Sequence, residues 1–408
     1  MAKRYDVAIV GGGLVGASLA CALAPLGLKI ALLESVEVSA AVQPSYDDRT
    51  LALSASSCKI LEGMGIWSSL AGNATPIREI QVREYQRPGR VIMEPGELDL
   101  DRFGHVVEAR VFGAAVLQEI PRWENLDFLC PAAVTEVTVT DDYACIDFTA
   151  DGGSHRVEAE LLVGADGANS FVRESLGIDT EKYDYRQTAV ICNITPELDH
   201  RGRAFECFTP TGPFAVMPHV NGRCGLIWCV PPDQVALMMD MPEADFLQEA
   251  HQRFGNHLGK FLKMGKRSCY PLRLVRALED IRPRAVILGN AAHAIHPVGA
   301  QGFNLGLRDA AVLAELLSDE SKKEAEADFG NSSLLQRYSS WRKTDHAGTI
   351  AYSDGLARIY SNPSRLAATA RTAGLLAHAF IPSLRRQLAV KAMGYRGRTP
   401  RLAAGDPL

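Results

Sequence analysis

The stretch YDVAIVGGGLVGASLACALAPLGLKIALLE, from Tyr5 to Glu34, constrains the fold more than any other part of the chain. An apolar run leads into Gly11-x-Gly13-x-x-Gly16, then into a helical pattern of small residues, then into a second apolar run that ends at the glutamate. This order predicts a strand, a tight glycine turn, a helix and a parallel strand, with backbone N–H groups open to a pyrophosphate. A carboxylate at the end of the second strand can bind a ribose hydroxyl, which favours FAD or NAD over NADP.

A second pattern, LLVGADGANSFVR, occupies residues 161–173. Asp166-Gly167 follows an apolar strand, and Ser170 and Arg173 follow in the next turn and helix. An Asp-Gly turn between strand and helix is common, so it gains meaning only beside the first motif. There it can orient a loop against a phosphate-bearing ligand.

The third pattern, ILGNAAHAIHPVGAQGFNLGLRDAA, occupies residues 287–311 and is rich in small residues after a short apolar strand. Gly299, Gly302 and Gly306 suit a loop whose backbone touches a flat or phosphorylated ligand. The same segment opens a helix whose first N–H groups are free to donate.

His293 and His296 in this segment raise the question of a metal site. Their spacing lacks the i, i+4 geometry of a helical zinc site and brings no third ligand, so no metal is predicted. Asp309 is given no catalytic role.

Composition narrows the class of protein. A chain of 408 residues is longer than one hydrophobic core usually supports, which predicts two domains. A net charge of −5 argues against a nucleic-acid partner. The segment from Ser364 onward contains eight Lys or Arg residues and one Asp, so its net charge is about +7. Such a segment can form a surface for anionic lipid or for an acidic partner, or it can be a solvated helix face. Nine cysteines without a CxxC pattern predict a reducing, cytoplasmic setting, and no apolar stretch is long enough for a signal peptide or a membrane span.

The order of elements predicts an α/β fold: a Rossmann-type domain interrupted by an antiparallel β-sheet domain, with a helical C-terminal region. Short β-rich runs such as TAVICNI and CGLIWCV, separated by Pro and Gly turns, predict the strands of this inserted antiparallel domain. The predicted parts are a nucleotide-binding domain over 1–75, 100–180 and 280–350, a substrate domain over 76–99 and 181–279, and a basic helical region over 351–408.

The three motifs in this order resemble the group A flavoprotein monooxygenases, the para-hydroxybenzoate hydroxylase-like family, over most of the chain. Within it, several long stretches resemble the ubiquinone-biosynthesis hydroxylases, on the side of the 2-polyprenyl-6-methoxyphenol hydroxylases. These stretches are YDDRTLALS, GRAFECFTPTGPFAVMPHVNGRCGLIWC, GKRSCYPL and the ending that starts SDGLARIYSNPSRLA.

The resemblance implies an FAD site and assigns residues to it. The ADP half would contact Gly11, Gly13, Gly16 and Glu34. Other implied cofactor contacts are Arg49, Arg110, Asp166 (which would also lie near the nicotinamide donor), Asn290, Gly302 and Asn304. The loop beside the reactive flavin edge would comprise Pro297, Gly299, Gly302 and Phe303, with no acid or base assigned.

Asn290 departs from the family pattern, which has Asp after this glycine. Its amide oxygen can still accept a hydrogen bond from a ribityl hydroxyl, but a charged acceptor makes a bond roughly twice as strong. We therefore expect FAD to be held more weakly than in relatives with Asp.

The resemblance further implies hydroxylation of a polyprenylated phenol through a C4a-hydroperoxyflavin, with O2 as co-substrate and NAD(P)H as electron donor. Because such a substrate is insoluble, the protein would be cytoplasmic and peripheral on the inner face of the membrane, in contact with the membrane surface and with other ubiquinone-biosynthesis proteins. Three readings compete: another FAD hydroxylase or a prenyl-lipid reductase of the same fold, a non-catalytic subunit of a lipid-biosynthesis complex, and an NAD-dependent dehydrogenase, which the late glycine-rich loop argues against.

Overall fold

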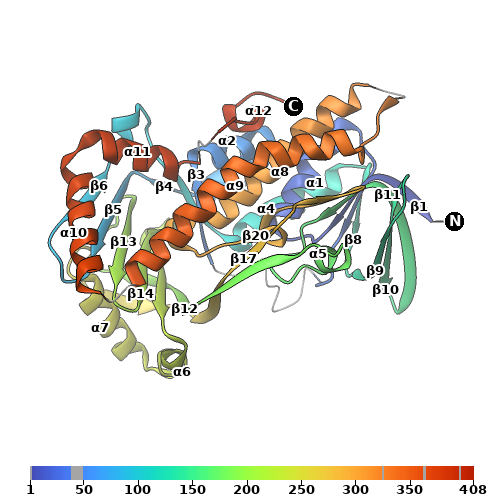
Figure 1. Ribbon diagram of the computed structural model, residues 1–408. Coiled ribbons are helices and arrows are strands. Elements are labelled where there is room, and N and C mark those ends of the chain that lie inside the picture. The colour runs from blue at the N-terminus through green and yellow to red at the C-terminus, as the bar shows by residue number, and fades with distance from the viewer. Residues whose placement is uncertain (1, 38–48, 324–325, 362–363, 395–396) are drawn as a thin grey trace.

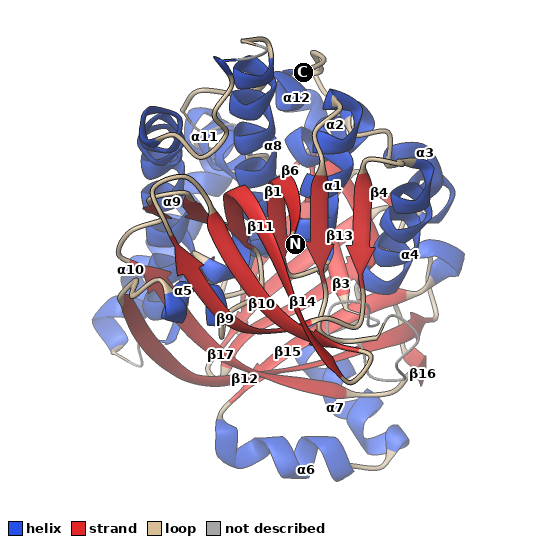
Figure 2. Cartoon of the chain, turned by 90° about the vertical axis from the view of Figure 1, so that its right-hand side faces the viewer, coloured by secondary structure: helices blue, strands red, loops and turns tan. Residues whose placement is uncertain are grey.

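A computed structural model of the chain describes residues 2–37, 49–323, 326–361, 364–394 and 397–408 (Figure 1). In these residues the strands form three sheets, of eight, nine and three strands. Helices pack on both larger sheets and continue to the C-terminus (Figures 1 and 2). The α/β fold predicted from the sequence is confirmed.

The eight-stranded sheet is built around the first strand of the chain. β1 pairs in parallel with β2 and with β11, and parallel pairing continues outward to β8 and β19. All four residues of β2 are buried, as expected for a parallel sheet covered on both faces. The strands of this sheet are β1 (Lys3–Val10), β2 (Ile30–Leu33), β8 (Leu126–Leu129), β9 (Ala133–Val139), β10 (Ala144–Ala150), β11 (Gly153–Gly164), β18 (Ile281–Arg282) and β19 (Ala285–Ile287).

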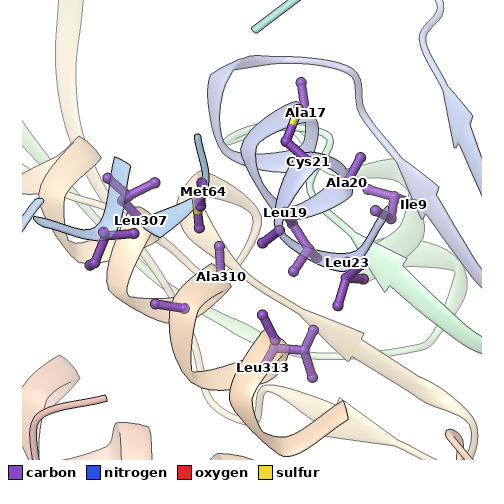
Figure 3. Packing of buried hydrophobic residues seen from close by; sticks show 14 of the residues in the cluster. Ile9, Ala17, Leu19, Ala20, Cys21, Leu23, Met64, Leu307, Ala310 and Leu313 are labelled. Atoms are coloured by element: carbon purple, nitrogen blue, oxygen red, sulfur yellow. The ribbon is translucent and has the colours of Figure 1, made fainter. Parts of the chain in front are cut away.

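Two helices that lie far apart in the sequence pack together on this sheet. α1 (Leu14–Leu23) packs against α8 (Gln301–Ser321), and Figure 3 shows their buried residues side by side. Leu19 and Leu307 are both fully buried there. Burying a leucine side chain stabilises a fold by roughly 1.5–3 kcal/mol, so this contact fixes the third motif against the first.

The nine-stranded sheet is largely antiparallel, with one parallel pair, β13 and β5. Its core lies between the sheet and the helices α6 (Val235–Asp240) and α7 (Glu243–Phe254), which cover the face away from α8 (Figure 2). The strands are β5 (Glu79–Glu84), β6 (Arg90–Met93), β12 (Thr180–Pro196), β13 (Arg203–Thr209), β14 (Gly212–Pro218), β15 (Cys224–Val230), β16 (Phe261–Met264), β17 (Ser268–Ala277) and β20 (His293–Ala294).

A small sheet links the two large ones: β3 (Thr50–Ser54) and β4 (Thr75–Ile77) both pair with β7 (Gly104–Glu108). The segment from 79 to 93 thus joins a sheet otherwise made from 180–294, and the exact domain boundaries stay a prediction. The other helices are α2 (Ala55–Gly63), α3 (Trp67–Leu70), α4 (Ala109–Glu119), α5 (Phe171–Ser175), α6 (Val235–Asp240), α7 (Glu243–Phe254), α9 (Ser332–Ser361), α10 (Arg365–Phe380), α11 (Pro382–Ala392) and α12 (Arg401–Ala404).

The basic C-terminal region finds acidic partners within the chain itself. Arg371 lies 2.9 Å from Glu84, and Arg385 lies 2.8 Å from Glu97. Arg401 in turn contacts an acidic residue of α8 at 2.7 Å. The charges of these three arginines therefore dock the region onto the body of the protein. In the part of the chain that the structure describes, no helix combines the length and apolar character needed to span a bilayer.

Candidate active site

The glycine turn after β1 leaves no room for side chains. A Cβ on Gly16 would lie 2.0 Å from the carbonyl oxygen of Gly11, and a Cβ on Gly12 would lie 2.7 Å from Cβ of Glu34. Gly11 itself has a φ of +107°, which favours glycine. The turn therefore presents bare backbone directly above the glutamate that ends the second strand.

Helix α1 begins at this turn without a side-chain cap and with no acidic residue in its first turn. Its first N–H groups and the positive end of its dipole are thus available to an anion. Glu34 is buried, and its Oε1 accepts a hydrogen bond from the Val36 N–H at 2.8 Å. These features fit the pyrophosphate and ribose of FAD.

The Asp166-Gly167 turn lies directly against the glycine turn: a Cβ on Gly11 would be 2.8 Å from Cα of Asp166. The Asp166 carboxylate accepts hydrogen bonds from the Ser170 hydroxyl at 2.5 Å and from the Val172 N–H at 3.0 Å. Its side chain therefore shapes the turn. A contact between Asp166 and FAD stays a prediction.

Arg173 joins the second motif to the third. Its guanidinium is buried and donates to the Ala291 carbonyl at 2.8 Å and to the Ala168 carbonyl at 3.0 Å. A cation that satisfies two backbone carbonyls holds both loops in place.

The glycine-rich third segment closes back onto α1. A Cβ on Gly306 would lie 3.0 Å from Cα of Gly289 and 3.0 Å from the side chain of Val15. The segment contains two short 3-10 turns, Gly289–Ala291 and Val298–Ala300, followed by α8. Ala300, with a φ of +51°, adopts a left-handed conformation that L residues rarely hold, which makes this a strained corner. All three motifs thus meet at one edge of the parallel sheet.

Residues predicted for the loop beside the flavin point in different directions. Gly299 and Ala300 line the cavity described below, whereas Phe303 packs edge-on against Phe112 at 5.0 Å between ring centroids. The Pro297 carbonyl accepts a hydrogen bond from the Ala300 N–H at 2.8 Å, which closes the turn. Gly302 lies in the first turn of α8.

Asn304 is a buried junction between α8 and the β3–α2 corner. Its Oδ1 accepts from the Ser54 N–H at 2.9 Å and the Ser57 hydroxyl at 2.7 Å. Its Nδ2 donates to the carbonyls of Ala52 at 2.8 Å and Ala300 at 2.7 Å. These four bonds use the whole amide, so the side chain holds the loop's conformation.

The remaining predicted cofactor residues lie apart from this junction. Arg49 places its guanidinium 5.1 Å from the Tyr270 ring centroid, and Arg110 pairs with Glu108 at 2.5 Å. The two arginines flank the paired ends of β3 and β7. Asn290 is exposed in the turn after β19.

Asp309 organises a buried polar cluster that was missed from the sequence. Its Oδ2 accepts from the Gly289 N–H at 3.1 Å and lies 2.6 Å from Nε2 of His293. Its Oδ1 accepts from Arg342 at 2.6 Å and lies 2.7 Å from Nε2 of His346. The only hint in the sequence was a charged Arg-Asp pair inside an apolar helical run.

Electrostatics keep this cluster charged and balanced. Burial alone would raise the pKa of Asp309, but His346, His293 and Arg342 hold it well below its usual range. Burial lowers the pKa of His346. The atoms of His293, His346 and Asp309 that could bind a metal ion lie within 4.8 Å of one another. However, the positively charged guanidinium of Arg342 already donates a hydrogen bond to Oδ1 of Asp309. The cluster therefore acts as an anchor for Gly289 through hydrogen bonds and ion pairs.

An apolar cavity of about 540 Å³ opens beside the third segment. Its volume is in the range of small-molecule sites. One wall is the Val298–Ala300 turn, another is the face of β5, β6 and β13, and the third is made by α9, α10 and α11. Figure 1 shows α10 and α11 beside β6. Representative lining residues are Ile80, Met93, Phe208, Leu356, Leu375 and Leu388.

Comparison with known proteins identifies the group to which this site belongs. Residues 4–350 match the FAD binding domain family. The chain is 37% identical to the ubiquinone hydroxylase UbiL of Rhodospirillum rubrum, covering 100% of this chain and 94% of that protein. It is 31% identical to the 3-demethoxyubiquinol 3-hydroxylase of Escherichia coli, over 95% of this chain and 98% of the relative.

Among solved structures, p-nitrophenol 4-monooxygenase PnpA from Pseudomonas putida superposes with a TM-score of 0.80 at 20% identity, covering 98% of this chain and 100% of that chain. At this identity the likeness shows the fold alone. The sequence match, the relatives and the fit of the glycine turn to a dinucleotide agree. The chain belongs to the FAD binding domain family and is an FAD-dependent monooxygenase similar to the ubiquinone hydroxylases.

Proposed function

We propose that this monooxygenase hydroxylates a membrane-borne polyprenylated phenol in ubiquinone biosynthesis, at the ring position para to the hydroxyl. The observation that carries the proposal is the apolar cavity that begins at the Val298–Ala300 turn and runs between the β5–β6 side of the sheet and α10 and α11. A small aromatic acid would need cationic groups, and Arg371, which lines this cavity, is already paired with Glu84 at 2.9 Å. An isoprenoid chain needs the apolar surface that the cavity offers.

FAD, when bound, supplies the redox chemistry that passes electrons from NAD(P)H to O2 and one oxygen atom to the ring. The backbone at Gly11, Gly13 and Gly16 would hold its pyrophosphate, and Glu34 its ribose. Asn290 would accept a hydrogen bond from the ribityl chain. The roles of Arg49, Arg110, Asp166 and the 297–304 loop stay predictions.

The walls of the cavity keep water from the reacting atoms. Phe208 and Tyr360 stack with ring centroids 3.4 Å apart, and Phe208 belongs to the same buried cluster as Val298 of the turn. Exclusion of water suppresses side reactions of activated oxygen. The chain contributes binding, orientation and dryness, while the cofactor contributes the oxidation.

Substrate would enter from the bilayer at the ends of α10. Exposed apolar side chains lie beside cavity-lining positions there: Leu366 is 84% exposed and Phe380 is 79% exposed. Ile359, which precedes α10, and Ile381, which follows Phe380, are also exposed. Such residues favour insertion into a lipid surface. Contact with other ubiquinone-biosynthesis proteins stays a prediction.

A deletion strain tests the proposal through its lipids. Accumulation of 2-polyprenyl-6-methoxyphenol and loss of ubiquinone are expected, whereas unchanged ubiquinone would refute the assignment. Accumulation of a later, more oxygenated precursor would place the reaction at another ring position. Substrate-dependent O2 uptake by the purified protein separates a hydroxylase from a reductase or a non-catalytic subunit.

A further inference from the structure

A single carboxyl group faces the apolar cavity from the middle of β13. Four residues of this strand line the cavity: Ala204, Phe205, Glu206 and Phe208. Side chains alternate along a strand, and Phe205 belongs to the core on the other face of the sheet, whereas Ala204 and Phe208 do not. Cys207, between them, belongs to the core on the other face of the sheet. Glu206 therefore projects into the proposed substrate site.

Among the described residues, no ion pair is found for Glu206, and its neighbours across the sheet are apolar. Its cross-strand neighbours are Val82 on β5 and Ala215 on β14, neither of which has a side-chain donor. Oε1 of Glu206 is buried without a hydrogen-bond partner among the described residues. Leaving a buried polar group unsatisfied costs about 1–3 kcal/mol, so such a group in a cavity indicates a partner that arrives with the ligand.

Among the described residues, no other titratable group that lines the cavity donates a hydrogen bond to Oε1 of Glu206. These groups come from α9 and α10: Tyr352, Tyr360, Arg371 and His378. Arg371 is committed to Glu84, and Nδ1 of His378 lies 2.8 Å from the Gly374 carbonyl. Desolvation raises the pKa of Glu206 to about 7.

The distance from Glu206 to the reactive loop suits an aromatic ring. Phe208, two residues further along β13, belongs to the same small buried cluster as Val298. Two residues of a strand span roughly 7 Å, so a ring bound at Glu206 would reach the Val298–Ala300 turn.

We propose that Glu206 accepts the hydrogen bond of the substrate's phenol hydroxyl and so holds the opposite edge of the ring toward the Val298–Ala300 turn. This rests on the proposed function only in taking a phenol as the substrate. The bond satisfies the orphaned carboxylate, draws the hydroxyl proton toward it and makes the ring richer in electrons. It also accounts for selection of the para carbon.

The test compares 2-geranylphenol with its methyl ether, 2-geranylanisole, as ligands of the FAD-loaded protein. Binding is followed by the change in flavin absorbance, without turnover. The variants are Glu206→Leu and Glu206→Gln, and the matched control is Glu160→Gln, a partly buried carboxyl on β11 far from the cavity that accepts from the Phe329 N–H. Glu206→Leu removes an unsatisfied group, so it should fold at least as well as the parent protein.

At pH 8 the parent protein and Glu160→Gln should bind the phenol about tenfold more tightly than the ether. Glu206→Leu should lose this preference, and Glu206→Gln should keep part of it. Because the carboxyl is charged above its raised pKa, the preference in the parent protein should weaken as the pH falls from 8 to 6, while Glu206→Gln should show no such change.

A preference that survives in Glu206→Leu, or one that is absent in the parent protein, would overturn the inference. Hydroxylation of 2-geranylphenol is measured separately. If hydroxylation persists while the preference is insensitive to Glu206, the proposed function stands and only the role of this residue fails.

Discussion

The cofactor loops and the apolar cavity share the turn from Val298 to Ala300, but different atoms build them. Around Gly11 and Gly16 the walls are backbone, and an added methyl group would collide with a carbonyl oxygen. In the cavity the walls are side chains from β5, β6, β13 and three C-terminal helices. The first region depends on the absence of side chains at glycines within a short stretch of sequence. The second depends on the packing of segments that lie far apart in the sequence. Substitutions should therefore act on cofactor and fold in one region and on substrate in the other.

The largest expected effect comes from Asp309→Asn, which breaks the anchor behind the cofactor loops. The amide keeps the shape but removes the charge that Arg342 faces at Oδ1, so Asp345 alone must balance both Arg342 and Arg308 in a buried site. Breaking a buried ion pair costs roughly 3–5 kcal/mol, and urea unfolding should show a loss of that size. Asp319→Asn, which weakens a more exposed pair with Arg401, should cost less than about 1 kcal/mol. Equal losses in the two variants would contradict the anchoring role.

Gly16→Ala is expected to have the second largest effect. It should lower the free energy of unfolding by about 3 kcal/mol and abolish FAD binding, because the added Cβ meets a backbone oxygen that cannot rotate away. FAD content after purification and thermal unfolding measure both effects. The control is Gly72→Ala, where an added Cβ meets nothing within 4 Å. Normal FAD content in Gly16→Ala would show that the turn tolerates a side chain.

Gly374→Leu should act on substrate alone. This residue lies inside α10, lines the cavity and has open space where a Cβ would go. Replacing a helical glycine gains up to about 1 kcal/mol, so the fold should be slightly more stable. The leucine would fill the cavity and raise the Kd for 2-geranylphenol about tenfold, a loss comparable to the burial of one apolar side chain.

The matched control for that variant is Gly355→Ala on α9, which is exposed, has equally open space and lies outside the cavity lining. It should gain the same stability without changing affinity. Unchanged affinity in Gly374→Leu would mean that the prenyl chain does not occupy the space beside α10.

The smallest expected effect is that of Asn290→Asp. A charged acceptor strengthens a hydrogen bond roughly twofold over a neutral one, so FAD should dissociate several-fold more slowly. Because Asn290 is exposed, the stability of the apoprotein should change by less than about 0.5 kcal/mol. FAD dissociation that is unchanged or faster would refute the account of this position.

The difference between the regions also explains what the sequence could predict. The family resemblance implied FAD. The three motifs, the α/β class and a dinucleotide-binding site followed from local patterns, because glycine spacing and strand ends act within about 30 residues. The cavity could not be found in this way, since Ile80, Phe208 and Leu375 meet only in the folded chain. The Asp309 cluster was hidden for the same reason, because Arg342 and His346 lie more than 30 residues away on another helix.

The charged C-terminal region shows the same limit. Its excess of Arg and Lys was compatible with a lipid surface, an acidic partner or a solvated helix face. Counting charges could not show that Glu84 and Glu97 of the same chain pair with two of these arginines. Glu206 was likewise indistinguishable from a surface glutamate until alternation along β13 placed it among apolar neighbours.

The central claim, that the cavity under α10 and α11 holds the prenyl chain of a phenol during hydroxylation, is tested most directly by kcat/KM for 2-geranylphenol and for 2-methylphenol in the parent protein and in Gly374→Leu. We expect the parent protein to prefer the prenylated phenol by at least about a hundredfold, because a geranyl chain buries many CH2 groups. In Gly374→Leu that preference should fall about tenfold while the rate with 2-methylphenol is unchanged. Equal kcat/KM for the two phenols in the parent protein would contradict the claim.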